Sequence, residues 1–592
     1  MCRIAGIIDK KSDTVAIDIL AMRDSMSHGG PDSSGVYHDE SKKMSLGHRR
    51  LSIIDLTDAG HQPMFSPDGS IVIVYNGEIY NYRELKRELQ NKGVVFFTNS
   101  DTEVIIQAYK LWGVACFEKL KGMFAIALHD KNKNELVLVR DPNGIKPLYY
   151  YADDSSLYFA SEIRAFKVTT RTWEESDDWK LYFLTFGFLP EPVTTLRGVK
   201  PLAKGTYLRI ETDTLKIKQE VFDADTYSDI IDTEEKAIHT IREKLNASVD
   251  RHLTSDAPIG MFLSGGIDSS LLTLIAKATG HNDLHTLSIV FDDKDFSEEE
   301  YQNIIARKVE SKHKPFKLTK ELFVEAIPDI FKAMDQPSAD GVNTYFICKF
   351  AKAYGLKAVL SGLGADELFG GYASFVRTGV VGKLNAMPKG LLQLTSKLHK
   401  DKYRKISFLT RKDAVGEYLF NRGFFSVAET SEIIGANSKE VTDKLMQIVV
   451  PDFVEQLHAG NRVSYMERNL YMQSQLLKDT DAMSMWHSIE VRVPFLDIDL
   501  VHAVNAISPG LKFDGVKPKH LLIESYKDIL PEKIWNRQKQ GFVFPFQKWM
   551  QGNETKVLQS VDAGMTSRYH KGAINWSRYW TYAVANMYSA LN

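Results

Sequence analysis

Cysteine is scarce in this sequence, and so are net charge and long apolar runs. The three cysteines, Cys2, Cys116 and Cys348, form no CxxC pair and are too few for a four-cysteine iron–sulfur cluster. Cys116 and Cys348 stand among apolar residues, which predicts buried, unreactive thiols on helices. Cys2 differs because of its position at the start of the chain.

The formal net charge of −2 over 592 residues gives no overall field that would attract nucleic acid or acidic lipid. No apolar run approaches the roughly 18 residues that span a bilayer, and the N-terminus lacks the apolar stretch of a signal peptide. We therefore expect a cytoplasmic protein with neither nucleic-acid nor membrane partners.

The chain is long enough for several hydrophobic cores, about two to four at roughly 150 residues per domain. Residues 1–165 read as short strands, such as the β-branched run 71–75, which ends in an Asn76-Gly77 turn signal. A helix is expected from Asp101. Because strands dominate, we predict an N-terminal α+β sandwich of layered sheets within residues 2–215.

The second predicted domain covers residues 233–592. It begins with a helix whose apolar residues recur at spacings of three and four, and then alternates strands with helices. This alternation predicts a doubly wound parallel sheet, whose ligands bind beyond the carboxyl ends of the strands. The rest of the chain beyond residue 400 reads as helical. The expected strands are 259–263, 284–291 and 357–360, and the expected helices include 297–310 and 344–354.

Cys2 becomes a terminal nucleophile if the initiator methionine is removed. A terminal amine with a pKa near ~8 can then take the proton of the thiol. A chance cysteine at this position is the alternative. Five motifs that follow in order weigh against chance: GPDSSG at 30–35, GHRRLSIIDL at 47–56, GHQPM at 60–64, NGEIYNY at 76–82 and SDTE at 100–103.

Together with the Cys-x-Ile-x-Gly opening, these motifs resemble the glutaminase domain of class II glutamine amidotransferases, the N-terminal-nucleophile hydrolases. The resemblance covers residues 2–165. One position departs from the usual His-Arg-Gly-Pro-Asp, because Gly29 stands where the family has arginine. The resemblance implies that Cys2 is the nucleophile, that Asn76 and Gly77 form the oxyanion hole, and that glutamine is bound by Arg50, Leu51, Ile53, Glu78 and Asp101. Arg49 is interpreted as a solvated surface charge.

SGGIDSS at 264–270 lies between a predicted strand and a predicted helix, and no Walker GxxxxGK[ST] occurs. Its glycines let the backbone approach an anion, its hydroxyls and the helix N–H groups can bind pyrophosphate, and Asp268 offers oxygen to Mg²⁺. The motif resembles the ATP pyrophosphatase family, which splits ATP between the α and β phosphates and leaves an acyl-adenylate. The implied ATP-binding residues are Leu263, Ser264, Gly265, Gly266, Asp268, Ser269, Ser270, Ile289, Ser361 and Gly362, and the implied magnesium ligands are Asp268 and Asp366.

EVRVPFLD at 490–497, NRQKQGF at 536–542 and the second loop SGLGADELFGGY at 361–372 resemble asparagine synthetases. The match makes Lys539 the residue that neutralises charge on the adenylate and pyrophosphate. It implies the substrates glutamine, ATP and a carboxylate acceptor, most simply aspartate, with Mg²⁺ as cofactor. Dimers are common in that family, so a homodimer is one expectation for this chain.

Leu363 departs from the family, which has glutamate in the second loop, and residues 335–344 lack the arginine that those enzymes carry. Three hypotheses stay open: amidation of aspartate, amidation of another carboxylate such as a sugar uronate, and an inactive binding protein that keeps the fold. The intact Cys2, Arg50, Asn76, Asp268, Asp366 and Lys539 weigh against the third.

Overall fold

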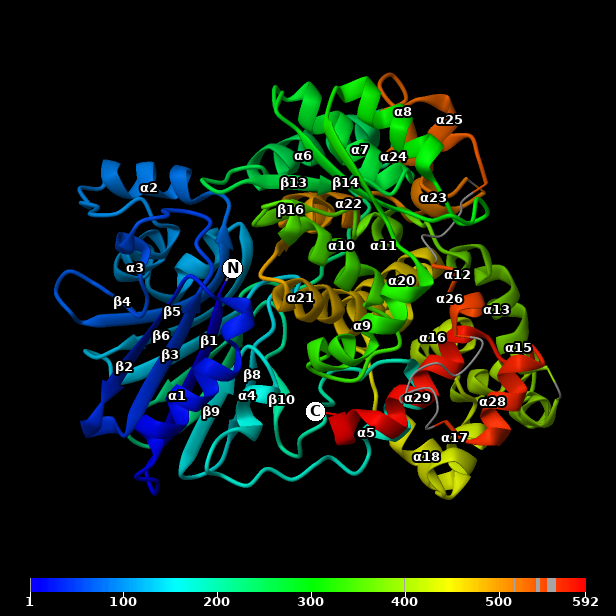
Figure 1. The fold of residues 1–592 in the computed structure, drawn as a ribbon, viewed down its shortest axis with the longest axis horizontal. Helices are drawn as coiled ribbons and strands as arrows, with labels where there is room; N and C mark the ends of the chain where they lie inside the picture. Colours follow the sequence, from blue (N-terminus) through cyan, green and yellow to red (C-terminus); the bar gives the residue numbers. More distant parts are fainter. Residues whose placement is uncertain (1, 399, 516, 539–543, 551–560, 592) are drawn as a thin grey trace.

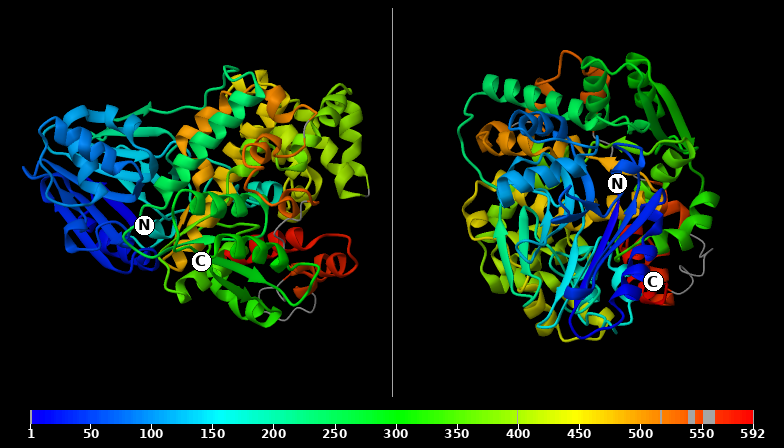
Figure 2. Two further views of the ribbon diagram at one scale, coloured as in Figure 1. Left: turned by 90° about the horizontal axis from the view of Figure 1, so that it is seen from above. Right: turned by 90° about the vertical axis from the view of Figure 1, so that its left-hand side faces the viewer.

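The computed structural model describes residues 2–398, 400–515, 517–538, 544–550 and 561–591. An antiparallel β-sandwich comes first in the chain, and an α/β half with many helices follows. The two halves lie side by side along the longest axis (Figures 1 and 2). The start of the first strand lies on the side of the sandwich that faces the second half (Figure 1).

The sandwich consists of two six-stranded sheets with the strand orders β10-β8-β9-β1-β3-β2 and β12-β11-β7-β6-β5-β4. All pairs of neighbouring strands are antiparallel. The strands are β1 (Arg3–Asp9), β2 (Ser33–Asp39), β3 (Met44–Arg50), β4 (Met64–Phe65), β5 (Ile71–Ile79), β6 (Gly122–Asp130), β7 (Glu135–Arg140), β8 (Tyr149–Ala152), β9 (Ser156–Ala160), β10 (Lys200–Pro201), β11 (Thr206–Glu211) and β12 (Ile217–Val221).

Alternation along β5 shows how the layers form. Val72 and Val74 belong to the core between the two sheets, whereas Ile71, Ile73 and Tyr75 belong to the core under the outer helices. Successive side chains of a strand point to opposite faces, so an unbroken apolar run indicates a strand buried on both faces. The outer helices on this side are α2 (Tyr82–Asn91) and α3 (Asp101–Trp112), and α1 (Val15–Ser25) covers the other sheet.

The turn predicted at Asn76-Gly77 is wrong, because both residues lie inside β5 and pair with Ala125 and Phe124 of β6. A Cβ on Gly77 would lie 2.1 Å from the carbonyl oxygen of Met123. The glycine therefore permits a close approach between two strands rather than a reversal of the chain.

The predicted parallel sheet is confirmed, with five strands in the order β15-β14-β13-β16-β17. Helices cover both faces, since Met261 and Leu360 pack in one core while Leu287 and Val359 pack in another. The strands are β13 (Ile259–Phe262), β14 (His285–Val290), β15 (Lys312–Lys317), β16 (Ala358–Leu360) and β17 (Glu490–Arg492), and the helices are α6 (Glu234–His252), α7 (Ile267–Ala278), α8 (Glu299–Val309), α9 (Lys320–Ala333), α10 (Val342–Ala353) and α11 (Ala365–Phe369).

The chain beyond residue 400 is mainly helical, as predicted. Within it, a π-helical segment η7 (Glu467–Leu476) runs directly into α21 (Leu477–Trp486), which lies on the side of the second half that faces the sandwich (Figure 1). No helix among the described residues is long and apolar enough to cross a membrane. Other helices of this region are α16 (Ala414–Arg422), α17 (Val427–Ile434), α18 (Ser438–Leu445), α20 (Ala459–Met466), α22 (Ile498–Asn505), α24 (His520–Glu524), α28 (Ala563–His570) and α29 (Trp576–Leu591).

Two candidate catalytic sites

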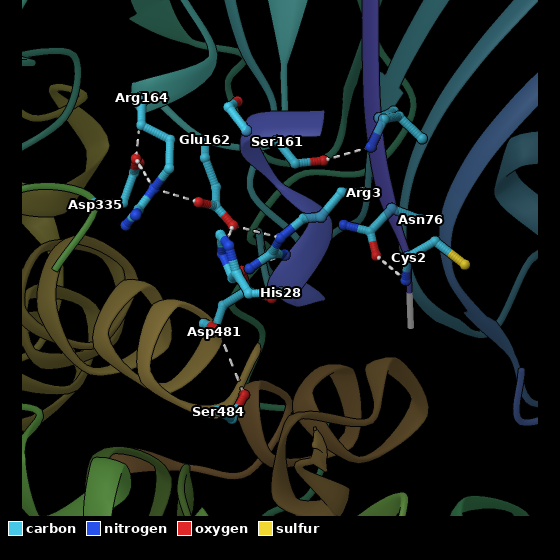
Figure 3. A network of polar contacts seen from close by, with 12 residues as sticks. Cys2, Arg3, His28, Asn76, Ser161, Glu162, Arg164, Asp335, Asp481 and Ser484 are labelled. Atoms are coloured by element: carbon cyan, nitrogen blue, oxygen red, sulfur yellow. Dashed lines mark hydrogen bonds and ion pairs between the residues drawn. The ribbon is translucent and has the colours of Figure 1, made fainter. Parts of the chain in front are cut away.

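Cys2 immediately precedes β1 and lies in the wall of a cavity formed with β5, the loop after β3 and the start of α3. Its backbone nitrogen donates to Asn76 Oδ1 at 3.1 Å, and its sulfur points to the opposite side of the strand from Arg3 (Figure 3). Burial raises the pKa of the Cys2 thiol, so a nearby base is needed to form thiolate. The cavity is lined by Cys2, Arg50, Leu51, Ile53, Ile54, Gly60, Gln62, Tyr75, Gly77, Glu78, Ser100, Asp101 and Thr102.

The side-chain amide of Asn76 has a donor nitrogen that no described residue uses. Its Oδ1 accepts from Cys2, while its Nδ2 is buried and has no hydrogen-bond partner among the described residues. A buried, unpaired amide N–H is costly and therefore marks a place where a ligand oxygen can be received. The geometry suits an oxyanion hole beside the Cys2 sulfur.

Arg50 is buried, and the loop that follows β3 holds its guanidinium. It donates to the carbonyl oxygens of Thr57, at 2.7 Å, and of Asp55. A Cβ on Gly60 would lie 2.0 Å from Arg50 Nη2, so glycine is required where the loop passes the guanidinium group of Arg50. These contacts orient a planar donor set of the kind that matches a carboxylate.

Glu78 and Asp101 add negative charge to the same cavity. Asp101 accepts from the hydroxyl of Tyr75 at 2.9 Å and from the backbone nitrogen of Ile79 at 3.1 Å. Burial raises the pKa of both carboxyl groups, and the charge of Glu490 adds to the rise at Glu78. A cationic ligand group would offset this charge, as an ammonium does.

Several residues of this cavity were missed by sequence reasoning. Gln62 accepts from the Tyr75 backbone at 2.7 Å and donates to Thr102 at 3.3 Å, so it braces the strand that carries Asn76. Both Gln62 and Thr102 lie inside quoted motifs, which was the available signal. Arg49, interpreted as a solvated surface charge, is 19% exposed and pairs with Asp24 at 2.7 Å in a contact that faces solvent.

The second cavity, of about 280 Å³, lies at the carboxyl ends of β13, β14 and β16. The loops 264–270 and 361–372 meet there, as expected for a doubly wound sheet. Of the expected ATP-binding residues, Leu263, Ser264, Asp268, Ser269, Ile289, Ser361 and Gly362 line the cavity, together with Asp366.

The other three expected residues, Gly265, Gly266 and Ser270, are not among those that line the cavity. Gly265 has φ +85°, and its carbonyl oxygen accepts from Arg537 at 3.0 Å. Gly266 is the N-cap of α7. The Ser270 hydroxyl is buried and has no partner among the described residues. Lys539 lies outside the described residues.

Lys519 joins the two expected magnesium ligands. Its Nζ lies 2.6 Å from Asp268 and 2.5 Å from Asp366, and its side chain is 5% exposed. A Cβ on Gly371 would lie 1.7 Å from Asp366 Oδ1, so glycine lets the second loop close over this contact. Sequence reasoning missed Lys519, whose carboxylate partners lie 251 and about 150 residues away along the chain.

The carboxylate pair fits magnesium. Asp268 and Asp366 offer two hard carboxylate ligands, and both face Lys519 Nζ. Among the described residues, they are not part of a group of three or more His, Cys, Asp or Glu that could hold a metal by itself. Mg²⁺ commonly takes one or two carboxylates and completes its shell with water and substrate phosphate. A site that depends on the nucleotide for its remaining ligands matches this donor set.

Two family models cover most of the chain. Residues 1–222 match the glutamine amidotransferase domain, and residues 240–568 match asparagine synthase. The chain belongs to the asparagine synthase family. It is therefore a glutamine-dependent amidotransferase of the asparagine synthase type, a ligase that uses ATP.

Curated relatives extend over nearly the whole synthase. It is 31% identical to asparagine synthetase [glutamine-hydrolyzing] 1 of Bacillus subtilis, over 100% of this chain and 97% of the relative. It is 32% identical to a putative asparagine synthetase of Mycobacterium tuberculosis, over 96% and 90%. It is 27% identical to Amidase chry2 of Gibberella zeae, over 94% and 89%.

Leu363 of the synthase is partly buried in the cavity wall and packs against the large apolar core. Nearby, burial and the charge of Asp366 raise the pKa of Glu367 to about 8, so this carboxyl is mostly protonated at pH 7. No lysine or arginine is among the described residues that line the cavity. Among the described residues, the cavity wall therefore offers no cationic side chain that could bind the second carboxylate of an acceptor such as aspartate.

The position of the Arg3 side chain explains why residue 29 is a glycine. A Cβ at position 29 would lie 2.8 Å from both Cγ and Nε of Arg3. The space beside the backbone of residue 29 is therefore filled by a guanidinium side chain, but one that comes from residue 3.

Proposed function

We propose that the synthase converts aspartate to asparagine, with glutamine as the nitrogen source and ATP cleaved to AMP and pyrophosphate. The observation that carries this proposal is the meeting of both motif loops in one cavity, with Asp268 and Asp366 on the same lysine. The cavity of Cys2, Arg50 and Asn76 supplies the ammonia.

In the glutaminase reaction, the Cys2 sulfur attacks the side-chain carbonyl carbon of glutamine. The terminal amine, exposed by loss of Met1, takes the thiol proton and passes it to the leaving ammonia. Asn76 Nδ2 stabilises the developing oxyanion, a contribution of roughly 3 kcal/mol for one such donor. Arg50 binds the α-carboxylate, and Asp101 and Glu78 bind the α-ammonium. Water then hydrolyses the thioester.

In the synthetase reaction, the aspartate side-chain carboxylate attacks the α-phosphate of ATP and pyrophosphate leaves. The hydroxyls of Ser264 and Ser269 and the N-terminus of α7 bind the phosphates, while Leu263 and Ile289 contact adenine. Asp268 and Asp366 would hold magnesium, which would neutralise charge on the phosphates. Ammonia then attacks the acyl carbon and AMP leaves, with Lys539 assigned to the developing charge by family resemblance.

The relatives favour aspartate over a sugar uronate as the acceptor. Those whose match covers nearly all of this chain include two asparagine synthetases. The departure at Leu363 is compatible with aspartate if ammonia needs no carboxylate at that position as it attacks.

The test is a chromatographic assay of purified enzyme with ATP, glutamine and a panel of carboxylates, followed by phosphorus NMR. We expect asparagine, AMP and pyrophosphate in equal amounts. Absence of asparagine at saturating aspartate would refute the acceptor, and formation of ADP with phosphate would refute the adenylate. Asp268→Asn should lower ATP-dependent synthesis while glutamine hydrolysis at Cys2 continues.

A further inference from the structure

Arg3 directly follows the proposed nucleophile and is completely buried. Its Nε donates to Glu162 at 2.6 Å and its Nη1 donates to Asp481 at 2.8 Å (Figure 3). Glu162 follows β9 of the sandwich, whereas Asp481 lies on α21 of the second half. One side chain thus ties the residue next to Cys2 to a helix 478 positions further along the chain.

The same turn of α21 borders the synthetase cavity. Asp479 and Thr480 line that cavity, and Asp481 is the next residue. Consecutive helical residues differ by about 100° and 1.5 Å, so a shift of α21 that follows ligand binding must move Asp481 as well. The helix therefore contacts the ATP site on one side and Arg3 on another.

The charged groups around Arg3 pair with one another and are mostly buried. Lys146 also pairs with Asp481, at 3.3 Å, and Arg164 pairs with Glu162 at 2.7 Å. Burial opposes ionisation of Glu162, but His28, Arg3 and Arg164 hold its pKa well below the usual range. Loss of one partner would leave another charge buried and uncompensated, so the pairs are expected to move together.

A second connection of the same form occurs on β17. Val491 lines the synthetase cavity, and the next residue, Arg492, lies 3.7 Å from Glu78 in the Cys2 cavity. Arg492 is completely buried and also pairs with Glu490 at 2.5 Å. Two separate elements of the second half thus connect the wall of the synthetase cavity to the glutaminase site through adjacent residues, α21 by way of Arg3 and β17 by way of Glu78.

We propose that Arg3 is a positioning residue for the glutaminase, and that its ion pair with Asp481 makes the placement of Cys2 depend on the state of the synthetase cavity. Arg3 and Cys2 share a backbone, and the Cys2 nitrogen is fixed on Asn76. Movement of Asp481 therefore alters the alignment of the sulfur with the oxyanion donor. Glutamine hydrolysis is fastest when ATP and acceptor occupy the second cavity. This inference rests on the proposed function of Cys2.

The experiment measures how fast a diazoketone analogue of glutamine inactivates Cys2, with and without ATP, magnesium and acceptor. In the wild type the ligands should accelerate labelling by about tenfold. Arg3→Met and Asp481→Asn should each label slowly and lose this acceleration. The double variant should be no worse than either single variant, because the two residues act as a pair. Arg3→Lys, which keeps the charge, should restore part of the response.

Arg49→Met is the matched control. Arg49 stands opposite Arg3 in the β1–β3 pairing, but its ion pair with Asp24 stays within the sandwich. It should label and respond like the wild type. Thermal unfolding identifies any variant that fails to fold. If Arg3→Met does not fold, Asp481→Asn tests the ion pair instead, because it keeps the shape of the side chain.

An acceleration of wild-type size in Arg3→Met or Asp481→Asn would overturn the proposal, whatever the basal rate. So would the absence of acceleration in the wild type. Failure of the proposed function gives a different result: the reagent would not modify Cys2, or Cys2→Ala would still hydrolyse glutamine.

Discussion

Cys2 and Cys116 are both buried thiols, but their surroundings predict opposite behaviour. Cys116 lies in the apolar core under α2 and α3, where burial raises its thiol pKa strongly. Cys2 has Asn76 beside it and faces a cavity. We expect Cys2→Ala to lower glutamine-dependent synthesis by a factor on the order of 10³ or more, and to leave ammonia-dependent synthesis intact. Cys116→Ala should change neither rate.

The two rates are measured with glutamine or ammonium as nitrogen source, and mass spectrometry determines the first residue. An active enzyme that retains Met1 would exclude the terminal amine as the base. Loss of both rates in Cys2→Ala would show that Cys2 has a structural role in the synthetase as well.

Lys512 illustrates how burial at a single residue makes stability depend on pH. Burial and the charge of Arg468 lower its pKa to about 7, from 10.5 in the unfolded chain. Between pH 10.5 and 7 the unfolded state binds a proton that the folded state does not, so this residue lowers stability as pH falls. Below pH 7 Lys512 is protonated in both states, and the loss in the free energy of unfolding, on the order of a few kcal/mol, stays constant.

Lys512→Met should remove this pH dependence. We expect the free energy of unfolding of the variant, relative to wild type, to rise by a few kcal/mol between pH 10 and pH 7. Loss of the hydrogen bond from Nζ to Val504 shifts all values equally and does not affect the slope. Denaturant titrations at several pH values measure the difference, and parallel curves would contradict the prediction.

At the scale of elements, Lys519 holds two loops together across the ends of β13 and β16. Lys519→Met would remove the cation that Asp268 and Asp366 share. Breaking a largely buried pair by removing one partner costs about 3–5 kcal/mol, somewhat less here because the carboxylates are about one-fifth exposed. We expect a clear fall in the thermal midpoint and loss of ATP-dependent synthesis.

Lys517→Met is the control for that experiment. Lys517 is exposed and lies two residues away, so it changes the net charge equally without touching the carboxylates. Calorimetry of both variants decides the question, and equal midpoints would show that Lys519 does not stabilise the loops.

The elements that could be predicted from sequence were those with a local signal. The helix of Asp101, the strand of residues 71–75 and the alternation around 259–360 follow from periodicity over short windows. β15 was missed because its KHKPFK sequence has little apolar pattern and contains proline, as suits an edge strand. β17 was missed because three residues carry no periodicity and its partner β16 lies about 130 residues earlier.

The candidate sites divide in the same way. Cys2, Arg50, Asn76 and the two phosphate-loop motifs could be chosen from sequence because motif order carried them. The contacts of Arg3, Arg492 and Lys519 could not, because each partner is distant along the chain and is specified only by the fold.

At the scale of the whole molecule, the two halves share a hydrophobic core. The segment 179–189 leaves the sandwich and inserts α5 (Trp179–Phe186) among the helices of the second half before the chain returns to β10. Backbone nitrogens of Phe424 and Phe425 donate to Thr185 and Leu184. Trp179 packs on Tyr588 of the last helix with ring centroids 5.7 Å apart.

An isolated segment 1–222 should therefore fold poorly, although it matches a family model of its own. It would expose Trp179, Phe183, Leu184, Phe186 and Phe188, each at most 1% accessible in the full chain. At about 1.5–3 kcal/mol for each side chain, the loss is on the order of 10 kcal/mol, comparable to the whole stability of a domain. It would also leave Arg3 without Asp481.

We expect this fragment to aggregate or to bind a hydrophobic dye, and to hydrolyse glutamine far more slowly than the full chain. A second fragment in which the five apolar residues are changed to serine tests the cause. It should regain solubility but not full glutaminase activity, because the ion pair with α21 is still missing. A soluble, fully active unmodified fragment would show that the sandwich folds independently and that its nucleophile needs nothing from the second half.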